Sequence, residues 1–122
     1  MPKVMLIEDD ATMLSLVSTL LDMEGFEVAA ITKENSAEAV VETVRKVNPA
    51  VAMIDVHVRQ ISGLDVVRRM RQLAELNSVR VLMVSGMDWH DECLAAGADS
   101  FILKPFMPDD LIKRIAALAN KK

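Results

Sequence analysis

Three consecutive acidic side chains follow the first apolar run of this 122-residue sequence. The segment VMLIEDDATML places Glu8, Asp9 and Asp10 directly after a run that has the length of a strand. Like charges about 4 Å apart repel by ~1 kcal/mol in water and by ~4 kcal/mol at an effective dielectric constant of 20. We therefore expect a cation beside this cluster.

Polar residues also end three later apolar runs. Asp55 ends one run, Ser85 follows another, and Lys104 with Pro105 follows the last. Carboxylates that converge with a hydroxyl and an ammonium suit Mg²⁺, which takes one or two carboxylates, keeps several waters and shares phosphate oxygens. The sequence therefore predicts a magnesium site, provided that the fold brings these residues together.

Apolar segments of strand length alternate five times with segments of helical period, without repeats or linkers. The predicted strands are Lys3 to Ile7, Glu27 to Ile31, Val51 to Ile54, Arg80 to Val84 and Ser100 to Leu103. This alternation predicts a single α/β domain over residues 1–122, with a doubly wound, five-stranded parallel sheet. With the flavodoxin-like strand order 2-1-3-4-5, a ligand binds where the first and third strands end. Glu8, Asp9 and Asp55 lie at that point.

Capping residues and glycines bound the predicted helices. The expected features are Gly25 at the end of the first helix, an Asn35 and Glu38 capping pair for a helix through Lys46, a helix from Gly63 to Leu76, a short helix from Trp89 to Ala96 that ends at Gly97, and Pro108 in the first turn of the last helix.

The composition predicts an aliphatic core and disfavours several partners. Apolar residues make up 52% of the chain and aromatic residues only 3%, while the net charge is −4. A negative charge disfavours binding to nucleic acid or to an anionic membrane. The sequence shows no secretory leader and no apolar stretch near twenty residues, and its single Cys93 cannot form an internal disulfide. We expect a cytoplasmic protein without membrane insertion.

These motifs together resemble the receiver domain of two-component response regulators over essentially the whole chain. Each motif alone is weak, but they follow the family's order and nearly its spacing, which makes the set specific. The matching positions are the acidic pair Glu8 and Asp9, the lone Asp55, Ser85 in VLMVSG, and Phe101 and Lys104 in GADSFILKP.

The resemblance implies a stand-alone receiver without an output domain, acting as a signalling protein rather than a metabolic enzyme. Asp55 would accept a phosphoryl group from a sensor histidine kinase or a histidine phosphotransfer protein and so switch binding to a downstream protein. Mg²⁺ would be held by Asp9, Asp55 and the backbone carbonyl of His57, with Glu8 acting through a water. Lys104 and Ser85 would contact phosphoryl oxygens, and Phe101 would turn inward. The protein would assist its own phosphorylation and dephosphorylation.

The chain departs from the family pattern at three places. Arg59 stands where relatives often have Pro, and Met107 occupies the N-cap position before Pro108. Gly97 follows Ser85 by only 12 residues, about one helical turn less than the family pattern. We expect a short fourth helix, and hence a reduced surface on the face that commonly carries partner binding or dimerisation in the family.

Other functions account for fewer of the motifs. A pseudoreceiver, an interaction module that works without phosphate, usually lacks a member of the acidic pair, the acceptor Asp or the Lys, and all are present here. A flavin carrier needs a neutral phosphate loop where this chain has EDDATM. A haloacid-dehalogenase-like phosphatase needs Asp-x-Asp, and DVH supplies only the first Asp.

Several residues have structural interpretations that we favour over functional ones. Asp10 is expected to cap the first helix, and isolated His57 and His90 lack the paired spacing of a zinc site. Cys93 is expected to be buried. The basic residues Arg59, Arg68, Arg69 and Arg71 are interpreted as a solvated face, or at most a kinase-docking rim.

Overall fold

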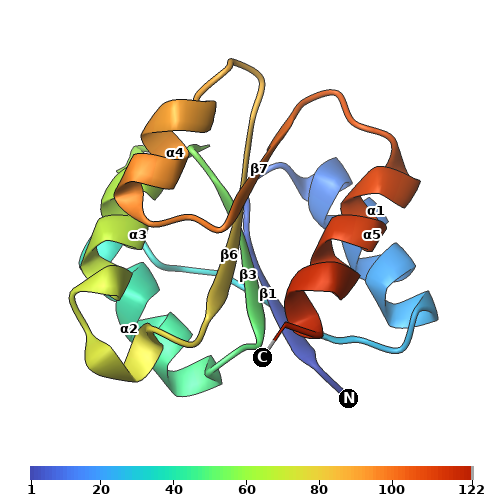
Figure 1. The fold of residues 1–122 in the computed structure, drawn as a ribbon, viewed down its shortest axis with the longest axis horizontal. Helices are drawn as coiled ribbons and strands as arrows, with labels where there is room; N and C mark the ends of the chain where they lie inside the picture. The colour runs from blue at the N-terminus through green and yellow to red at the C-terminus, as the bar shows by residue number, and fades with distance from the viewer. Residues whose placement is uncertain (122) are drawn as a thin grey trace.

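A computed structural model of the chain describes residues 1–121 as a central parallel sheet between two layers of helices (Figure 1). The strands of this sheet are β1 (Lys3–Ile7), β2 (Glu27–Ala30), β3 (Val51–Asp55), β6 (Arg80–Ser85) and β7 (Ser100–Leu103). A small hairpin consists of β4 (His57–Val58) and β5 (Ile61–Ser62). The helices are α1 (Ala11–Met23), α2 (Ala37–Val47), α3 (Gly63–Arg71), α4 (His90–Ala96) and α5 (Pro108–Ala119), with a 3-10 turn, η1, at Ala74–Leu76.

The order of the sheet is β2-β1-β3-β6-β7, and every neighbouring pair is parallel. Counted along the sheet-forming strands, this is the predicted order 2-1-3-4-5. The doubly wound, flavodoxin-like architecture is therefore confirmed. No helix within residues 1–121 is both long enough and apolar enough to cross a membrane.

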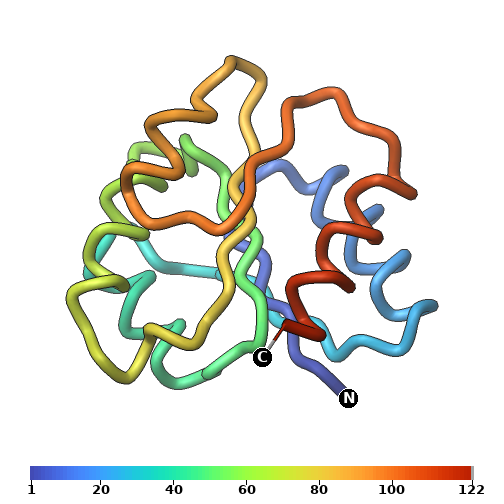
Figure 2. The backbone as a smooth tube through the Cα atoms, in the orientation of Figure 1, coloured from blue at the N-terminus to red at the C-terminus, as the bar shows by residue number. Residues whose placement is uncertain are grey.

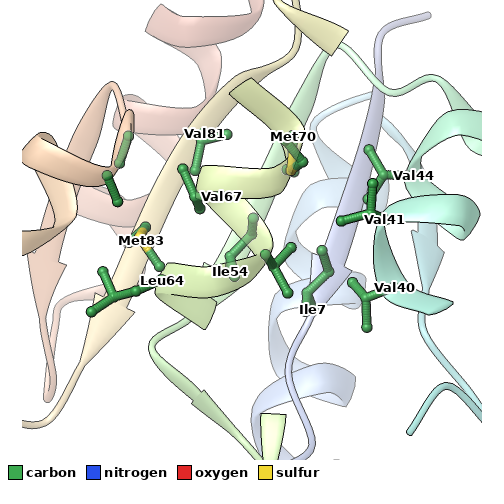
Figure 3. Close-up of a cluster of buried hydrophobic side chains, with 14 of the residues drawn as sticks. Ile7, Val40, Val41, Val44, Ile54, Leu64, Val67, Met70, Val81 and Met83 are labelled. Carbon is green, nitrogen blue, oxygen red and sulfur yellow. The ribbon is translucent and has the colours of Figure 1, made fainter. Parts of the chain in front are cut away.

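Each face of the sheet has its own apolar core. Helices α2, α3 and α4 cover one face, and α1 and α5 cover the other (Figure 1). Figure 3 shows the first core, where aliphatic and Met side chains from the sheet meet those of α2 and α3; labelled there are Ile7, Val40, Val41, Val44, Ile54, Leu64, Val67, Met70, Val81 and Met83. These cores hold the strands at a fixed register, and the strand ends are thereby fixed too.

The register aligns the polar residues at one edge of the sheet. Ile7 lies beside Ile54, so the next residues, Glu8 and Asp55, are also neighbours. Ser85 is paired with Leu103, so Lys104 follows directly beside it. The loops after β6 and β7 lie at the end of the molecule opposite the two chain termini (Figure 2). The four polar residues therefore meet at the carboxyl edge.

Several helix boundaries differ from the predictions: α2 ends at Val47 rather than Lys46, and α4 begins at His90, with Trp89 as its N-cap. The N-cap of α2 is Ser36, whose hydroxyl accepts a hydrogen bond from the Ala39 N–H, so the proposed Asn35 cap is wrong by one residue. The third helix ends at Arg71 rather than at Leu76, because the chain leaves the α-helix at Gln72 before the separate turn η1.

The other capping predictions hold. Asp10 caps α1 by accepting hydrogen bonds from the N–H groups of Thr12 and Met13. Gly25, immediately after the end of α1, has a φ of +88°, a conformation that favours glycine. Met107 makes no side-chain cap for α5, as expected from its lack of a hydrogen-bonding oxygen.

Helix α4 is short, with seven residues, and its end is held by a polar network. The Arg71 guanidinium donates hydrogen bonds to the carbonyls of Gly97 and Leu76 and to the carboxylate of Asp99. The assignment of Arg71 to a solvated basic face is therefore wrong, because this side chain is largely enclosed and links α3 to the segment between α4 and β7.

Candidate functional site

Lys104 lies between two carboxylates at the carboxyl edge of the sheet. Its Nζ is 2.9 Å from Glu8 Oε1 and 2.5 Å from Asp55 Oδ2. The Glu8 side chain is only 1% exposed and that of Asp55 10%, whereas the Lys104 side chain is 24% exposed. The ammonium thus neutralises charge that the fold removes from water, which is the condition for burying such groups.

Burial and pairing act in opposite directions on these groups. Burial raises the pKa of Glu8 above its usual value, although the hydrogen bond from Lys104 and the main-chain bond from Asp10 oppose the shift. Burial also opposes the charged form of Lys104, but hydrogen bonds to Asp55 and Glu8 outweigh it and raise the pKa of this ammonium. Lys104 therefore remains cationic in the site.

Main-chain N–H groups orient all three carboxylates. Glu8 Oε2 accepts hydrogen bonds from the N–H groups of Asp9 and Asp10. Asp55 Oδ1 accepts one from the N–H of His57 at 2.8 Å. Asp9 Oδ2 accepts one from the N–H of Arg59 at 2.7 Å. The hairpin that follows β3 thus turns two N–H groups toward the acidic cluster.

The start of α3 packs directly against β3, the strand that ends at Asp55. A Cβ atom built on Gly63 would lie 2.1 Å from the main-chain oxygen of Asp55, so only glycine fits at this position. The Gly63 N–H also donates to the carbonyl of Val56 at 2.7 Å. The end of β3, which carries Asp55, therefore packs against the first residue of α3, a glycine.

Ser85 and Phe101 are both buried near the carboxyl edge of the sheet. Ser85 is buried at the end of β6, where its Oγ accepts a hydrogen bond from the N–H of Met87. Phe101 is 9% exposed and its ring meets the His90 ring edge to face. The Phe101 ring thus lies inward in this structure.

Trp89 lies against the hairpin that follows β3. The Trp89 ring contacts the His57 ring in a T-shaped arrangement, with centroids 5.8 Å apart. Its indole N–H is buried, and it makes no hydrogen bond within residues 1–121. The Trp89 ring thus connects the loop after β6 to the hairpin after β3. Cys93 is buried as predicted, and this burial raises the pKa of its thiol to about 11.

The donor set suits Mg²⁺ in its usual mode of binding. The Lys104 ammonium contacts the carboxylates of Glu8 and Asp55, and Asp9, bound to the Arg59 N–H, adds a third carboxylate, so the ionised cluster carries two negative charges in excess of the positive charge of Lys104. Within residues 1–121, no three acidic, His or Cys side chains form a metal cage by themselves. Mg²⁺ does not need one, because it takes one or two carboxylates and completes its shell with carbonyl oxygens and water.

The structure brings together most of the predicted site residues and adds one. Glu8, Asp55 and Lys104 are in direct contact, and Asp9 joins them through the hairpin. From the sequence, Arg59 was interpreted as a departure from the family pattern and as part of a solvated basic face, without a role in the site. Its N–H contact with Asp9 spans 50 residues of chain, and no local sequence signal predicts such a bond.

Comparison with known proteins gives a consistent assignment. The chain is 32% identical over 121 residues to the two-component response regulator PhoP of Pseudomonas aeruginosa, covering 98% of this chain and 52% of that protein. It is 29% identical over 124 residues to the phosphate regulon transcriptional regulatory protein PhoB of Rhizobium meliloti, covering 99% of this chain and 53% of that protein. The chain thus spans about half the length of these curated relatives.

Solved structures share the fold. The chemotaxis protein CheY4 of Vibrio cholerae superimposes with a TM-score of 0.84 at 24% identity, covering 97% of this chain and 98% of that one. The receiver domain of the sensor histidine kinase PA1611 from Pseudomonas aeruginosa, described with a magnesium ion in its active-site cleft, gives 0.84 at 17% identity, covering 98% of both chains. The model of the response regulator receiver domain matches residues 4–116, and the chain therefore belongs to this family.

Proposed function

We propose that this chain is a phosphorylation-controlled switch that accepts one phosphoryl group on Asp55 in a Mg²⁺-dependent reaction. The donor would be a phosphohistidine on a sensor kinase or a phosphotransfer protein, and the readout would be altered binding to a downstream protein rather than direct binding to nucleic acid. The chain would serve as a signalling protein that assists its own phosphorylation and dephosphorylation.

One observation carries this proposal: both oxygens of Asp55 are held in place while its charge is balanced. Oδ1 accepts the His57 N–H and Oδ2 contacts Lys104 Nζ. A carboxylate can attack a negatively charged phosphoryl group only if charge is neutralised and the nucleophile is positioned, which is most of what phosphoryl transfer requires. The Glu8–Lys104–Asp55 cluster meets both requirements.

The transfer itself balances simply. A carboxylate oxygen of Asp55 forms a bond to phosphorus, while the P–N bond of the phosphohistidine breaks and its electron pair stays on the imidazole. After the transfer, the Lys104 ammonium would donate a hydrogen bond to one of the phosphoryl oxygens. The new species is an acyl phosphate on β3, at the opening of the carboxyl edge.

Asp9, Asp55 and the carbonyl of His57 would hold Mg²⁺, with Glu8 acting through a water. When bound, the ion supplies positive charge to the phosphoryl oxygens. The N–H bonds that Asp9 and Glu8 accept keep these carboxylates at the site.

Ser85 and Phe101 would report phosphorylation to the surface. The Ser85 hydroxyl accepts one hydrogen bond from Met87 and keeps its own proton to donate to a phosphoryl oxygen. If Ser85 moved toward the phosphoryl group to make this hydrogen bond, the loop that leads from Ser85 to Trp89 and α4 would move with it. The edge-to-face contact between His90 and Phe101 joins that helix to β7.

Intact-mass spectrometry after incubation with Mg²⁺ and acetyl phosphate tests the proposal. We expect wild type to gain the mass of one phosphoryl group, and Asp55→Asn to gain none. Asp22→Asn, which makes the same change at an exposed site on α1, should behave like wild type. An adduct that persists in Asp55→Asn would disprove the acceptor assignment, and a wild type without any adduct would instead favour the pseudoreceiver alternative.

A further inference from the structure

Arg59 has an unusual backbone conformation beside the acidic cluster. Its φ is +54°, in the left-handed region that favours glycine, and it lies in the turn between β4 and β5. Apart from Asn48 and glycines, no other residue in the described part of the chain has a positive φ. A non-glycine residue is held in this region only where the surroundings impose it, and such positions cluster at functional sites.

The left-handed turn directs the Arg59 N–H to Asp9. The hydrogen bond to Asp9 Oδ2 is 2.7 Å long, and it is the only side-chain hydrogen bond recorded for the Asp9 carboxylate among residues 1–121. Asp9 is exposed, so nothing else restricts its rotamer in the way that burial restricts Glu8. A proline at position 59 would have no N–H to donate, and its ring, which fixes φ at about −65°, could not adopt the left-handed turn.

The side chain of Arg59 holds the same turn through a second contact, with the loop between β2 and α2. Its Nη2 donates to the carbonyl of Glu34 at 2.5 Å, in the loop between β2 and α2. The Glu34 carboxylate is itself fixed, since it accepts hydrogen bonds from the N–H groups of Thr32 and Lys33 and from the Thr43 hydroxyl. Arg59 therefore connects three loops at the carboxyl edge: those after β1, β2 and β4.

We infer that Arg59 is a positioning residue for the magnesium ligand Asp9. Its guanidinium, held by Glu34, fixes the left-handed turn, and the turn presents the N–H that orients the Asp9 carboxylate toward the site. One oxygen of the carboxylate remains free for the ion. This inference rests on the proposed function, because it assumes that Asp9 binds Mg²⁺.

Charge and positioning predict opposite results at this residue. The Arg59 guanidinium is a cation near a cation-binding site, so if it acted through its charge alone, its removal would strengthen Mg²⁺ binding. If Arg59 positions Asp9, its removal weakens binding, since partners that orient a metal ligand typically contribute 10–100-fold in affinity. The sign of the change therefore separates the two roles.

Isothermal titration of Mg²⁺ into wild type, Arg59→Ala and Arg59→Pro measures that sign without requiring phosphorylation. We expect the dissociation constant to rise about tenfold or more in Arg59→Pro, which lacks the N–H and cannot adopt the left-handed turn, and to rise less in Arg59→Ala, which keeps the N–H and lacks only the side-chain anchor. Arg68→Ala removes the same charge from an exposed site on α3 and should leave the constant unchanged. Circular dichroism identifies the variants that fold.

The outcomes are decisive in each case. An unchanged or lower dissociation constant in Arg59→Ala overturns the role of the guanidinium, and the same result in a folded Arg59→Pro overturns the role of the N–H. A wild type that binds no Mg²⁺ overturns the inference together with the magnesium part of the proposed function. Normal Mg²⁺ binding and phosphorylation in wild type, with no weakening in the variants, overturns this inference alone.

Discussion

The buried acid Glu8 is retained in the fold because its partners compensate for the loss of water. Its carboxylate receives the Lys104 ammonium on one oxygen and two main-chain N–H groups on the other. Removing one member of such a cluster leaves a buried charge or donor unpaired, which costs far more than an exposed ion pair contributes. At the scale of single residues, the site is therefore a balance of burial against pairing.

Glu8→Gln should change how stability depends on pH. Because burial raises the pKa of Glu8, the folded state holds this proton more tightly than the unfolded state. The resulting stability is fully present below the usual pKa of 4.5 and is lost as pH rises through the raised value. Gln cannot lose a proton, so the free energy of unfolding of wild type should fall relative to that of the variant as pH increases.

Urea unfolding of both proteins at several pH values, in buffer containing a chelator, measures this difference. Glu24→Gln, at an exposed residue at the end of α1, should run parallel to wild type. Parallel profiles for Glu8→Gln and wild type would contradict the assigned direction of the shift.

The residue types at the strand ends were sufficient to predict that one edge of the sheet gathers Glu8, Asp9, Asp55 and Lys104, because parallel strands bring their carboxyl ends to one edge. The contact from the Arg59 N–H to Asp9 could not be predicted in this way. It depends on the left-handed turn between β4 and β5. Each of these strands has only two residues, which is too short to show a hydrophobic period in the sequence.

At the scale of elements, the site depends on how closely helices approach the strand ends. Helix α3 begins at Gly63, against the main chain of Asp55, and α4 ends at Ala96, with Gly97, whose φ is +117°, as its C-cap. Both glycines permit contacts that any side chain would block. The loops around the acceptor are thus fixed by helix positions as well as by the sheet.

Gly63→Ala should disturb the acceptor strand. The added methyl group would lie 2.1 Å from the Asp55 main-chain oxygen, and because the obstacle is backbone, β3 or α3 must shift. We expect a loss of roughly 1–3 kcal/mol in the free energy of unfolding and slower phosphorylation by acetyl phosphate. Gly86→Ala, where nothing lies within 4 Å of the added atom, is the matched control. Wild-type stability in Gly63→Ala would show that the contact is easily relieved.

Arg71→Ala should loosen the end of the short helix α4. The change removes hydrogen bonds to the Gly97 and Leu76 carbonyls and to Asp99, and leaves Asp99, whose side chain is 18% exposed, without its closest ion-pair partner. Hydrogen bonds to charged groups contribute about 1.5–3 kcal/mol each, so a destabilisation of roughly 2–3 kcal/mol is expected from chemical denaturation.

Arg68→Ala, an exposed neighbour on the same helix, should change stability by about 0.5 kcal/mol or less. Equal effects of the two substitutions would indicate that the Arg71 network contributes nothing beyond a surface arginine.

Periodicity predicted the regular elements well and their ends less well. The α2 cap differs by one residue because Asn35 and Ser36 are both good caps, and only the tertiary path of the chain selects Ser36. The end of α3 was missed because residues 72–76 keep helical spacing while Leu76 is buried through the separate turn η1. The link that Arg71 makes to the end of α4 was missed because its partners Gly97 and Asp99 lie 26 and 28 residues away in the sequence.

At the scale of the whole molecule, the strand order was predictable because the chain alternates regularly and parallel strands need crossover helices. The two apolar cores then place every site residue at one edge, while β7, α4 and α5 form the neighbouring surface (Figure 1). The resemblance stated above associates this face with dimerisation in the family. The size of the face formed by β7, α4 and α5 decides whether this chain can dimerise through it.

We expect the phosphorylated protein to remain monomeric on this face. A helix of seven residues spans only about 10 Å, whereas a stable interface buries about 800 Å² on each partner. The exposed Leu94 and Leu103 are single apolar side chains and do not replace the missing turn. Sedimentation velocity with Mg²⁺ and beryllium fluoride, a phosphoryl mimic, should give the same molecular mass as the untreated protein. Dimerisation that the mimic induces and that Lys113→Glu on α5 abolishes would show instead that the shortened face still supports association.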